Sequence, residues 1–192
     1  KHTLTFVMAP MVHWPEVIMT YSESGITELS HNLHKCIKKH ICRGKYRDGN
    51  RPVLLNSWEG VYFNINEPGM DQMMADIASM GGELFVMDDG WFGVKYPRLT
   101  DNCALGDWEV DRNKLPNGIG WLVEQAHKHG IKFGIWIEPE MANTTSELFE
   151  KHPEWVLKAP ERDLVTGRGG TQLVLDLCNP EVQDFIFKIV DD

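Results

Sequence analysis

The stretch Leu84-Phe85-Val86-Met87-Asp88-Asp89-Gly90-Trp91 runs from apolar residues straight into two carboxylates and a glycine. A short, continuous apolar run is typical of a strand that is buried on both faces of a parallel sheet. The acidic pair and Gly90 stand where such a strand must end. The stretch therefore predicts a buried parallel strand that presents polar side chains at its carboxyl end.

Similar runs lie on either side of this strand and are separated from it by helical patterns. Residues 53–58 and 133–138 have strand character. A helix is predicted from Pro68-Gly69 to Gly81, with apolar residues at helical spacing, and another from Pro116 to Gly130. Alternating strands and helices indicate a parallel sheet with helices packed against it.

The same alternation continues toward the end of the chain. Residues 144–147, Thr-Thr-Ser-Glu, match a capping box at a helix start. Residues 173–177 are again extended, and Asn179-Pro180 caps a helix whose buried face is predicted to carry Val182, Phe185, Ile186 and Ile189.

Two folds fit this order, an open doubly wound sheet and a closed barrel. No strand is followed by the glycine-rich turn of a dinucleotide-binding fold. Aromatic and acidic residues instead follow the strands, at 58–59, 88–91 and 138–141, where barrel enzymes build their sites. A (β/α)8 TIM barrel needs about 250 residues. We therefore predict that residues 51–192 are the first half of an α/β (β/α)8 barrel.

Residues 1–50 have a different character. Residues 4–8 and 16–21 look extended, and an amphipathic helix is predicted to run to about Cys42. Its apolar stripe is predicted to be Leu29, Leu33, Cys36, Ile37 and Ile41. The basic connector 43–50 looks like a joint between two domains. Residues 1–50 are therefore predicted to be the end of a separate domain together with a linker helix.

Composition excludes several classes of protein. The chain has 192 residues, of which 42% are hydrophobic, and a net charge of −9. The hydrophobic content is sufficient for a core, and the acidic balance argues against a nucleic-acid partner. No apolar run approaches the roughly 20 residues that cross a bilayer. The start at Lys1-His2 is neither a signal peptide nor a usual initiator, so we expect a piece of a longer protein.

The four cysteines form no CxxC pair and are expected to be free thiols. Cys36 and Cys42 do lie among several histidines, which raises the possibility of a metal site. A helix turns about 100° per residue, so His34 and Cys36 would point to opposite sides. A packed amphipathic helix is the better interpretation.

The segment 90–115 is long for a loop between a strand and a helix. It is rich in aromatic and acidic residues, which suits a sugar, because an indole packs on the apolar face of the ring while carboxylates accept from its hydroxyls. The alternative is a small aromatic core that fixes the loop. We expect that role for Phe92 and Tyr96, and ligand contact for Trp108.

Adjacent carboxylates at a strand end repel each other, so Asp88 and Asp89 are candidates for a ligand site. Three interpretations remain open from the residues alone. One aspartate could be a catalytic group, both could bind a divalent metal together with Glu138 and Glu140, or both could hydrogen-bond sugar hydroxyls.

A set of linked motifs resembles the microbial α-galactosidases of glycoside hydrolase family 36. The residues that carry this resemblance are Asp88-Asp89-Gly90-Trp91-Phe92-Gly93, Leu105-Gly106-Asp107-Trp108, Phe133 to Met141, His152-Pro153-Glu154-Trp155 and Gln172 to Leu177. The match covers residues 52–192 in order. Residues 1–50 resemble the end of the β-sandwich domain that precedes the barrel in this family, with its linker helix.

The resemblance implies a retaining hydrolase of terminal α-linked galactose that needs no metal or cofactor. It assigns sugar binding to Asp88 and Asp89, to the tryptophans Trp58 and Trp108, and to Arg168. The sequence departs from the family pattern after Arg168, where Gly169-Gly170-Thr171 lengthen the spacing to the next strand. The family's nucleophile and acid/base are expected C-terminal of Asp192, so the chain alone is expected to be inactive.

The expected partners are α-galactoside oligosaccharides of the melibiose and raffinose type, with no nucleic acid and no membrane, and the full-length protein is expected to be a homo-oligomer. The alternatives within the fold are an α-N-acetylgalactosaminidase and a galactosyl transferase of the raffinose-synthase type. A catalytically inactive sugar-binding relative is the alternative of another class.

Overall fold

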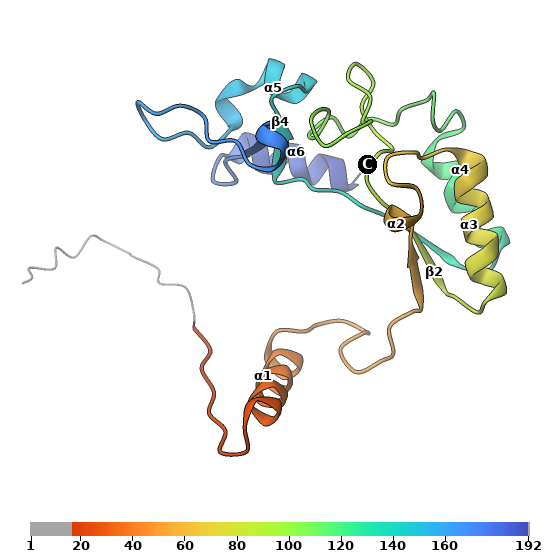
Figure 1. The fold of residues 1–192 in the computed structure, drawn as a ribbon, viewed down its shortest axis with the longest axis vertical. Coiled ribbons are helices and arrows are strands. Elements are labelled where there is room, and N and C mark those ends of the chain that lie inside the picture. The colour runs from red at the N-terminus through yellow and green to blue at the C-terminus, as the bar shows by residue number, and fades with distance from the viewer. Residues whose placement is uncertain (1–16, 192) are drawn as a thin grey trace, which may run out of the picture. The chain divides into compact units, whose positions relative to one another are not determined.

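The computed structural model describes residues 17–191, which fall into two compact units, one ending at Arg51 and the other beginning at Pro52 (Figure 1). In the first unit, α1 (Ile26–His40) confirms the predicted helix. Along its expected stripe, Leu29, Leu33 and Cys36 are half-buried, whereas Ile37 and Ile41 are exposed. Residues 17–21 have no regular structure, and the extended segment expected at 4–8 lies outside the described residues.

The second unit is built on a parallel sheet with the strand order β1-β2-β3. Its strands are β1 (Leu54–Asn56), β2 (Leu84–Met87) and β3 (Lys132–Ile135), each shorter than the apolar run that predicted it. Leu55 lies opposite Phe85, which in turn lies opposite Phe133. Consecutive strands are therefore neighbours, and their carboxyl ends meet at one edge of the sheet.

Two helices connect these strands, α3 (Glu67–Ser79) and α4 (Gly118–Lys128). The side chain of Asn66 accepts a hydrogen bond from the amide of Gly69 and so caps α3, whose first turn contains the predicted proline. The two helices lie side by side next to β2 (Figure 1). The predicted alternation of strands and helices is confirmed over this part.

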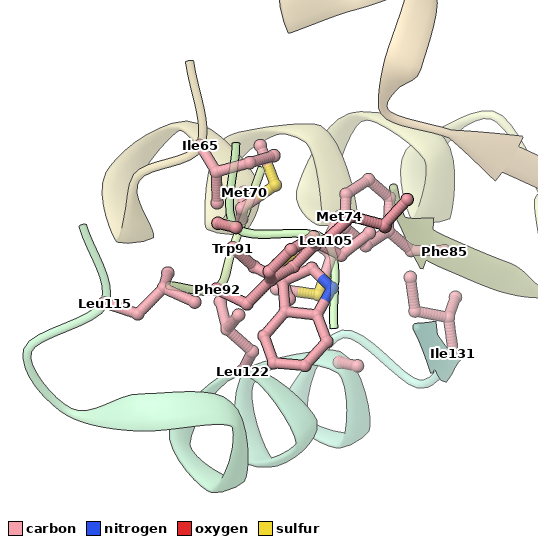
Figure 2. Close-up of a cluster of buried hydrophobic side chains, with 13 residues drawn as sticks. Ile65, Met70, Met74, Phe85, Trp91, Phe92, Leu105, Leu115, Leu122 and Ile131 are labelled. Carbon is pink, nitrogen blue, oxygen red and sulfur yellow. The ribbon is translucent and has the colours of Figure 1, made fainter. Parts of the chain in front are cut away.

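The main core lies between these helices and the sheet. Figure 2 shows Met70 and Met74 of α3, Phe85 of β2 and Leu122 of α4 gathered around the ring of Trp91. Because alternate residues of β2 point to opposite faces, Phe85 and Met87 are buried while Leu84 and Val86 are only half-buried. On β1, Leu54 is 48% exposed. One face of the sheet is thus covered by helices and the other is open.

The C-terminal part has a second, smaller core. Here β4 (Met141–Asn143) pairs with β5 (Gln172–Val174) in an antiparallel sheet. The helices α5 (Glu147–Lys151) and α6 (Pro180–Asp191) lie beside it (Figure 1). Trp155, Leu173 and Val182 are buried in this core, and Phe185 and Ile186 pack against it, as predicted for α6.

Two expectations are corrected here. Of the extended segment predicted at 173–177, only the part up to Val174 lies in a strand, β5, which pairs antiparallel with β4 and does not join the parallel sheet. The helix at 147 is capped by Ser146, whose hydroxyl accepts from the amide of Phe149, and not by a box starting at Thr144.

Short helical turns also occur at α2 (Trp58–Val61), η1 (Pro153–Trp155) and η2 (Arg168–Gly170). Within residues 17–191, no helix combines the length and apolar character needed to cross a bilayer.

Candidate functional site

The tandem aspartates lie directly after β2, at the edge where the carboxyl ends of the parallel strands meet. The chain turns sharply at Gly90, which has a φ of 113°. A Cβ atom at this position would lie 2.9 Å from the Cα of Phe63. Only glycine allows both this backbone conformation and this close approach.

Asp88 is half-buried and is held by Asn56 of β1 and by Ser57, which follows that strand. Its Oδ2 accepts a hydrogen bond of 2.6 Å from the side-chain amide of Asn56, and its backbone N–H donates to the hydroxyl of Ser57 at 3.0 Å. Its Oδ1 accepts from the backbone of Asp89 at 2.7 Å. The carboxylate is oriented by neutral donors and remains partly open to solvent.

Asp89 is in a different environment, because it is buried against Arg98, which is 2% exposed. The Nε of Arg98 donates to Oδ1 at 2.9 Å and Nη2 donates to Oδ2 at 2.7 Å. This two-point ion pair neutralises Asp89 and relieves its repulsion with Asp88.

Arg98 connects the long loop to the rest of the unit. Its Nη1 donates to the carbonyl of Cys103 at 2.7 Å and to the Oδ1 of Asn143 at 3.0 Å. Its guanidinium carbon lies 5.4 Å from the ring centre of Phe63 and 5.7 Å from that of Phe92. The buried charge is therefore satisfied by both polar and aromatic neighbours.

Arg168 has an exposed side chain and lies in η2. Its Nη2 is 3.2 Å from the Oδ2 of Asp101. The other carboxylate oxygen of Asp101 is 3.7 Å from the Nη2 of Arg98. Asp101 thus lies between Arg168 and the arginine that holds Asp89.

Lys114 fixes the far end of the long loop. Its ammonium group donates to the carbonyls of Phe63, Gly90 and Arg98 at 2.9, 2.6 and 2.9 Å. Burial lowers the pKa of Lys114 from its ordinary value, against the opposing effects of Asp111 and Asp89.

The aromatic side chains of the loop form a cluster. The ring centre of Trp108 lies 4.5 Å from that of Phe92, 6.0 Å from Trp91 and 6.1 Å from Trp136. Its Nε1 is buried, and no hydrogen-bond partner exists for it among the described residues. Trp108 is therefore packed, and it also carries a polar atom that packing alone does not satisfy.

Trp58 begins α2, immediately beyond β1, and is half-buried. Its ring makes edge-to-face contacts with Tyr62 and Phe63, with centroids 5.2 and 5.0 Å apart. Its backbone N–H donates to the Oδ1 of Asn56, whose amide holds Asp88. Trp58 and Asp88 are thus tied to the same asparagine.

Glu138 follows β3 and is linked to β5 by a hydrogen bond of 2.6 Å from the amide of Gln172. Burial raises the pKa of Glu138 above its ordinary value, and repulsion from Glu140 adds to this shift. In the described part of the chain, no group of three or more His, Cys, Asp or Glu side chains is arranged to hold a metal ion.

The structure therefore joins Trp58 to Asp88 through Asn56, and Asp89 to Arg168 through Arg98 and Asp101. Sequence reasoning missed the roles of Arg98, Asp101 and Asn143. Arg98 and Asp101 stood out only as charges within a long aromatic loop. Nothing in their spacing predicted which strand end they would contact.

Comparison with known proteins identifies the family of this chain. The model of the family described as melibiase matches residues 12–192. The chain is 43% identical over 186 residues to alpha-galactosidase C of Emericella nidulans, covering 93% of the chain and 24% of that protein. It therefore spans about a quarter of the length of this curated relative.

Solved structures give the same result. The glycoside hydrolase family 36 α-galactosidase AgaB of Geobacillus stearothermophilus matches with a TM-score of 0.80 and 43% identity, over 89% of this chain and 23% of that one. A variant of AgaA from the same organism, solved in complex with raffinose, matches with a TM-score of 0.78 and 42% identity over 84% of this chain and 22% of that one. The chain belongs to the melibiase family, the glycoside hydrolase family 36 α-galactosidases.

Proposed function

We propose that the protein carrying this chain is a retaining α-galactosidase that removes terminal α-linked galactose from oligosaccharides of the melibiose and raffinose type. The observation that carries this proposal is the tandem carboxylate at the carboxyl end of β2 in a chain of this family. Homologues solved in complex with raffinose and stachyose support the substrate class.

In this proposal, residues 51–192 form the first half of a (β/α)8 barrel. The sequential parallel order of β1, β2 and β3, with α3 and α4 packed on one face, supports it. The open face of the sheet, with Leu54 exposed, would face the interior of the barrel. Further strands would close the barrel, and their side chains would fill this interior. Residues 1–50 would be the end of a preceding β-sandwich domain and its linker helix.

The sugar-recognition side chains in this proposal are Trp58, Asp88, Asp89, Trp108 and Arg168. Asp88 has the most accessible acceptor, since neutral donors hold it and it remains half-buried. Asp89 would accept from hydroxyls with the lone pairs that its two hydrogen bonds from Arg98 leave free. The tryptophan rings would cover the apolar face of the galactose.

Bond cleavage would be carried out by two aspartates C-terminal of Asp192, with carboxyl groups about 5–5.5 Å apart. One would attack the anomeric carbon and form a glycosyl–enzyme intermediate. The other would protonate the leaving oxygen and then activate water. This chain would bind and orient galactose for that reaction.

The test uses the complete natural protein and measures galactose release from raffinose and melibiose. Asp88→Asn should lower kcat/KM by about a hundredfold, because truncating a charged hydrogen bond costs about 1.5–3 kcal/mol. Asp76→Asn is the matched control, since Asp76 is exposed on α3 and its carboxylate accepts from the side-chain amide of Gln72 on the same helix.

Excess chelator should leave the activity unchanged, because the proposed mechanism uses no metal. Activity that is lost in chelator and restored by a divalent ion would contradict the assignment of Asp88 and Asp89. Transfer of galactose to another sugar, in place of release to water, would favour the transferase alternative.

A further inference from the structure

A row of alternating charges crosses the candidate site from β2 to η2. Asp89 pairs with Arg98 at 2.7 Å, Arg98 lies 3.7 Å from Asp101, and Asp101 lies 3.2 Å from Arg168. The row begins at a buried ion pair and ends at an exposed guanidinium. It links two of the residues to which we assign sugar binding.

Asp101 is fixed in place at its backbone as well as at its carboxylate. Its carbonyl accepts a hydrogen bond of 3.0 Å from the side-chain amide of Asn143, which is fully buried. The same amide also donates to the hydroxyl of Thr171 at 3.1 Å. Asn143 therefore holds the segment around Asp101 and the segment that follows Arg168 together.

The turn that carries Arg168 fits closely onto the loop beside Asp101. Gly169 has a φ of 65°, and a Cβ atom there would lie 2.5 Å from the Oδ1 of Asn102. A larger residue at 169 would be strained by this positive φ, and the side chain of Asn102 would have to move away. Gly169 therefore allows the turn that carries Arg168 to lie close to the loop beside Asp101.

An exposed arginine normally has many rotamers, and restricting them on binding weakens affinity. Asp101 restricts these rotamers before a ligand arrives. We propose that Asp101 is a positioning residue, which holds Arg168 in the conformation that contacts the galactoside. This inference rests on the proposed α-galactosidase function.

The first measurement compares Asp101→Asn with wild type in the complete protein. The substitution keeps the size and the backbone contact of the residue but removes the charge between the two arginines. KM for raffinose should rise about tenfold while kcat stays within about twofold, because a binding interaction is lost. Glu150→Gln is the matched control: it breaks an exposed ion pair between the same loop and α5, and should leave KM unchanged.

The second measurement is a double-mutant cycle with Arg168→Gln. If Asp101 acts through Arg168, Asp101→Asn should raise KM in the wild-type background and have little further effect in Arg168→Gln. Independent effects of the two substitutions would overturn the inference. So would an unchanged KM in an active Asp101→Asn protein, or a loss of kcat together with a lowered melting temperature.

The two proposals fail in different ways. A folded wild-type protein that releases no galactose from α-galactosides overturns the proposed function, and the positioning role with it. An active wild type whose KM does not respond to Asp101→Asn overturns the positioning role alone.

Discussion

At the scale of single residues, Asp88 and Asp89 are chemically equivalent but lie in different environments. Asp88 is oriented by an amide and a hydroxyl, whereas Asp89 is paired with a buried arginine. Breaking such a buried pair by removing one partner commonly costs about 3–5 kcal/mol. Asp89 thus has a structural role in this ion pair, whereas Asp88 has no cationic partner in the described chain.

Trp108 is the residue whose two roles can be separated by substitution. Trp108→Ala should lower the free energy of unfolding by about 3 kcal/mol, since the ring packs against three other aromatic rings. Trp108→Phe keeps most of this packing and removes the unpaired Nε1. It should retain the melting temperature but reduce kcat/KM if the indole contacts the sugar. A Trp108→Phe protein with wild-type kinetics would restrict Trp108 to packing.

The sequence predicted this site only in part, and the reason is physical. Carboxylates after a short apolar run are visible in the sequence, because the strand and its end are local features. The partners of those carboxylates are not local. Arg98 follows Asp89 by nine residues in an irregular loop, and Asn143 reaches Arg98 from β4. No periodicity relates such positions.

At the scale of elements, α5 depends on a carboxylate from a distant loop. The side chain of Asp107 accepts from the amides of Glu147 and Leu148 at 2.8 and 2.9 Å, in the first turn of this five-residue helix. A helix of this length is unstable alone. Asp107 and Ser146 together satisfy amides that the helix itself leaves unpaired.

Asp107→Asn should therefore loosen α5. An asparagine offers one acceptor where the aspartate offers two, so an amide of Glu147 or Leu148 loses its partner at a cost of about 1–3 kcal/mol. Hydrogen exchange of residues 147–151 in the complete protein should become faster, while exchange in α4 stays the same. Unchanged exchange at α5 would contradict the capping role.

The stabilising effect of Asp107 should also depend on pH. Burial raises the pKa of Asp107 above its ordinary 3.8, and outweighs the two amide hydrogen bonds that lower it. Between pH 3.8 and the raised pKa of folded Asp107, the folded state binds more protons than the unfolded state. The free energy of unfolding therefore falls as pH rises through this interval. Because asparagine does not titrate, Asp107→Asn should remove the fall in melting temperature that the titration of Asp107 causes as pH rises.

Strands were harder to predict than helices. The helix boundaries follow from local signals, such as Pro68 and the cap at Asn66, and α3, α4 and α6 lie where they were expected. The partner of a strand is set by tertiary packing. For this reason the extended segment predicted at 173–177 was correct only in part, since β5 ends at Val174, and its membership of the parallel sheet was wrong.

At the scale of the whole molecule, the second unit leaves apolar surface uncovered. β1 and β3 are the edge strands of its parallel sheet, and one face of that sheet is open. On α6, Phe187 is 73% exposed and Val190 is 65% exposed. Exposed edges and apolar side chains of this kind favour association.

The 192-residue chain made alone should therefore not behave as a compact monomer in sizing chromatography. It should also release no nitrophenol from nitrophenyl α-galactoside above a buffer control, because in the proposed mechanism the nucleophile and the acid/base lie C-terminal of Asp192, and binding groups alone cannot perform double displacement. Turnover by a pure sample would mean that the catalytic pair lies among Asp88, Asp89, Glu138 and Glu140.

The anchoring of Lys114 has a consequence for how a substrate would enter. Its ammonium group binds three backbone carbonyls: that of Phe63 between α2 and α3, that of Gly90 beyond β2, and that of Arg98 within the long loop. Swinging this loop away would strip the ammonium of these acceptors and break the Arg98–Asp89 pair as well. These contacts fix the segment 90–115 in one position, so it is not built to open and close over the site. In the proposed α-galactosidase, a movement that admits or releases the sugar would therefore come from another part of the protein.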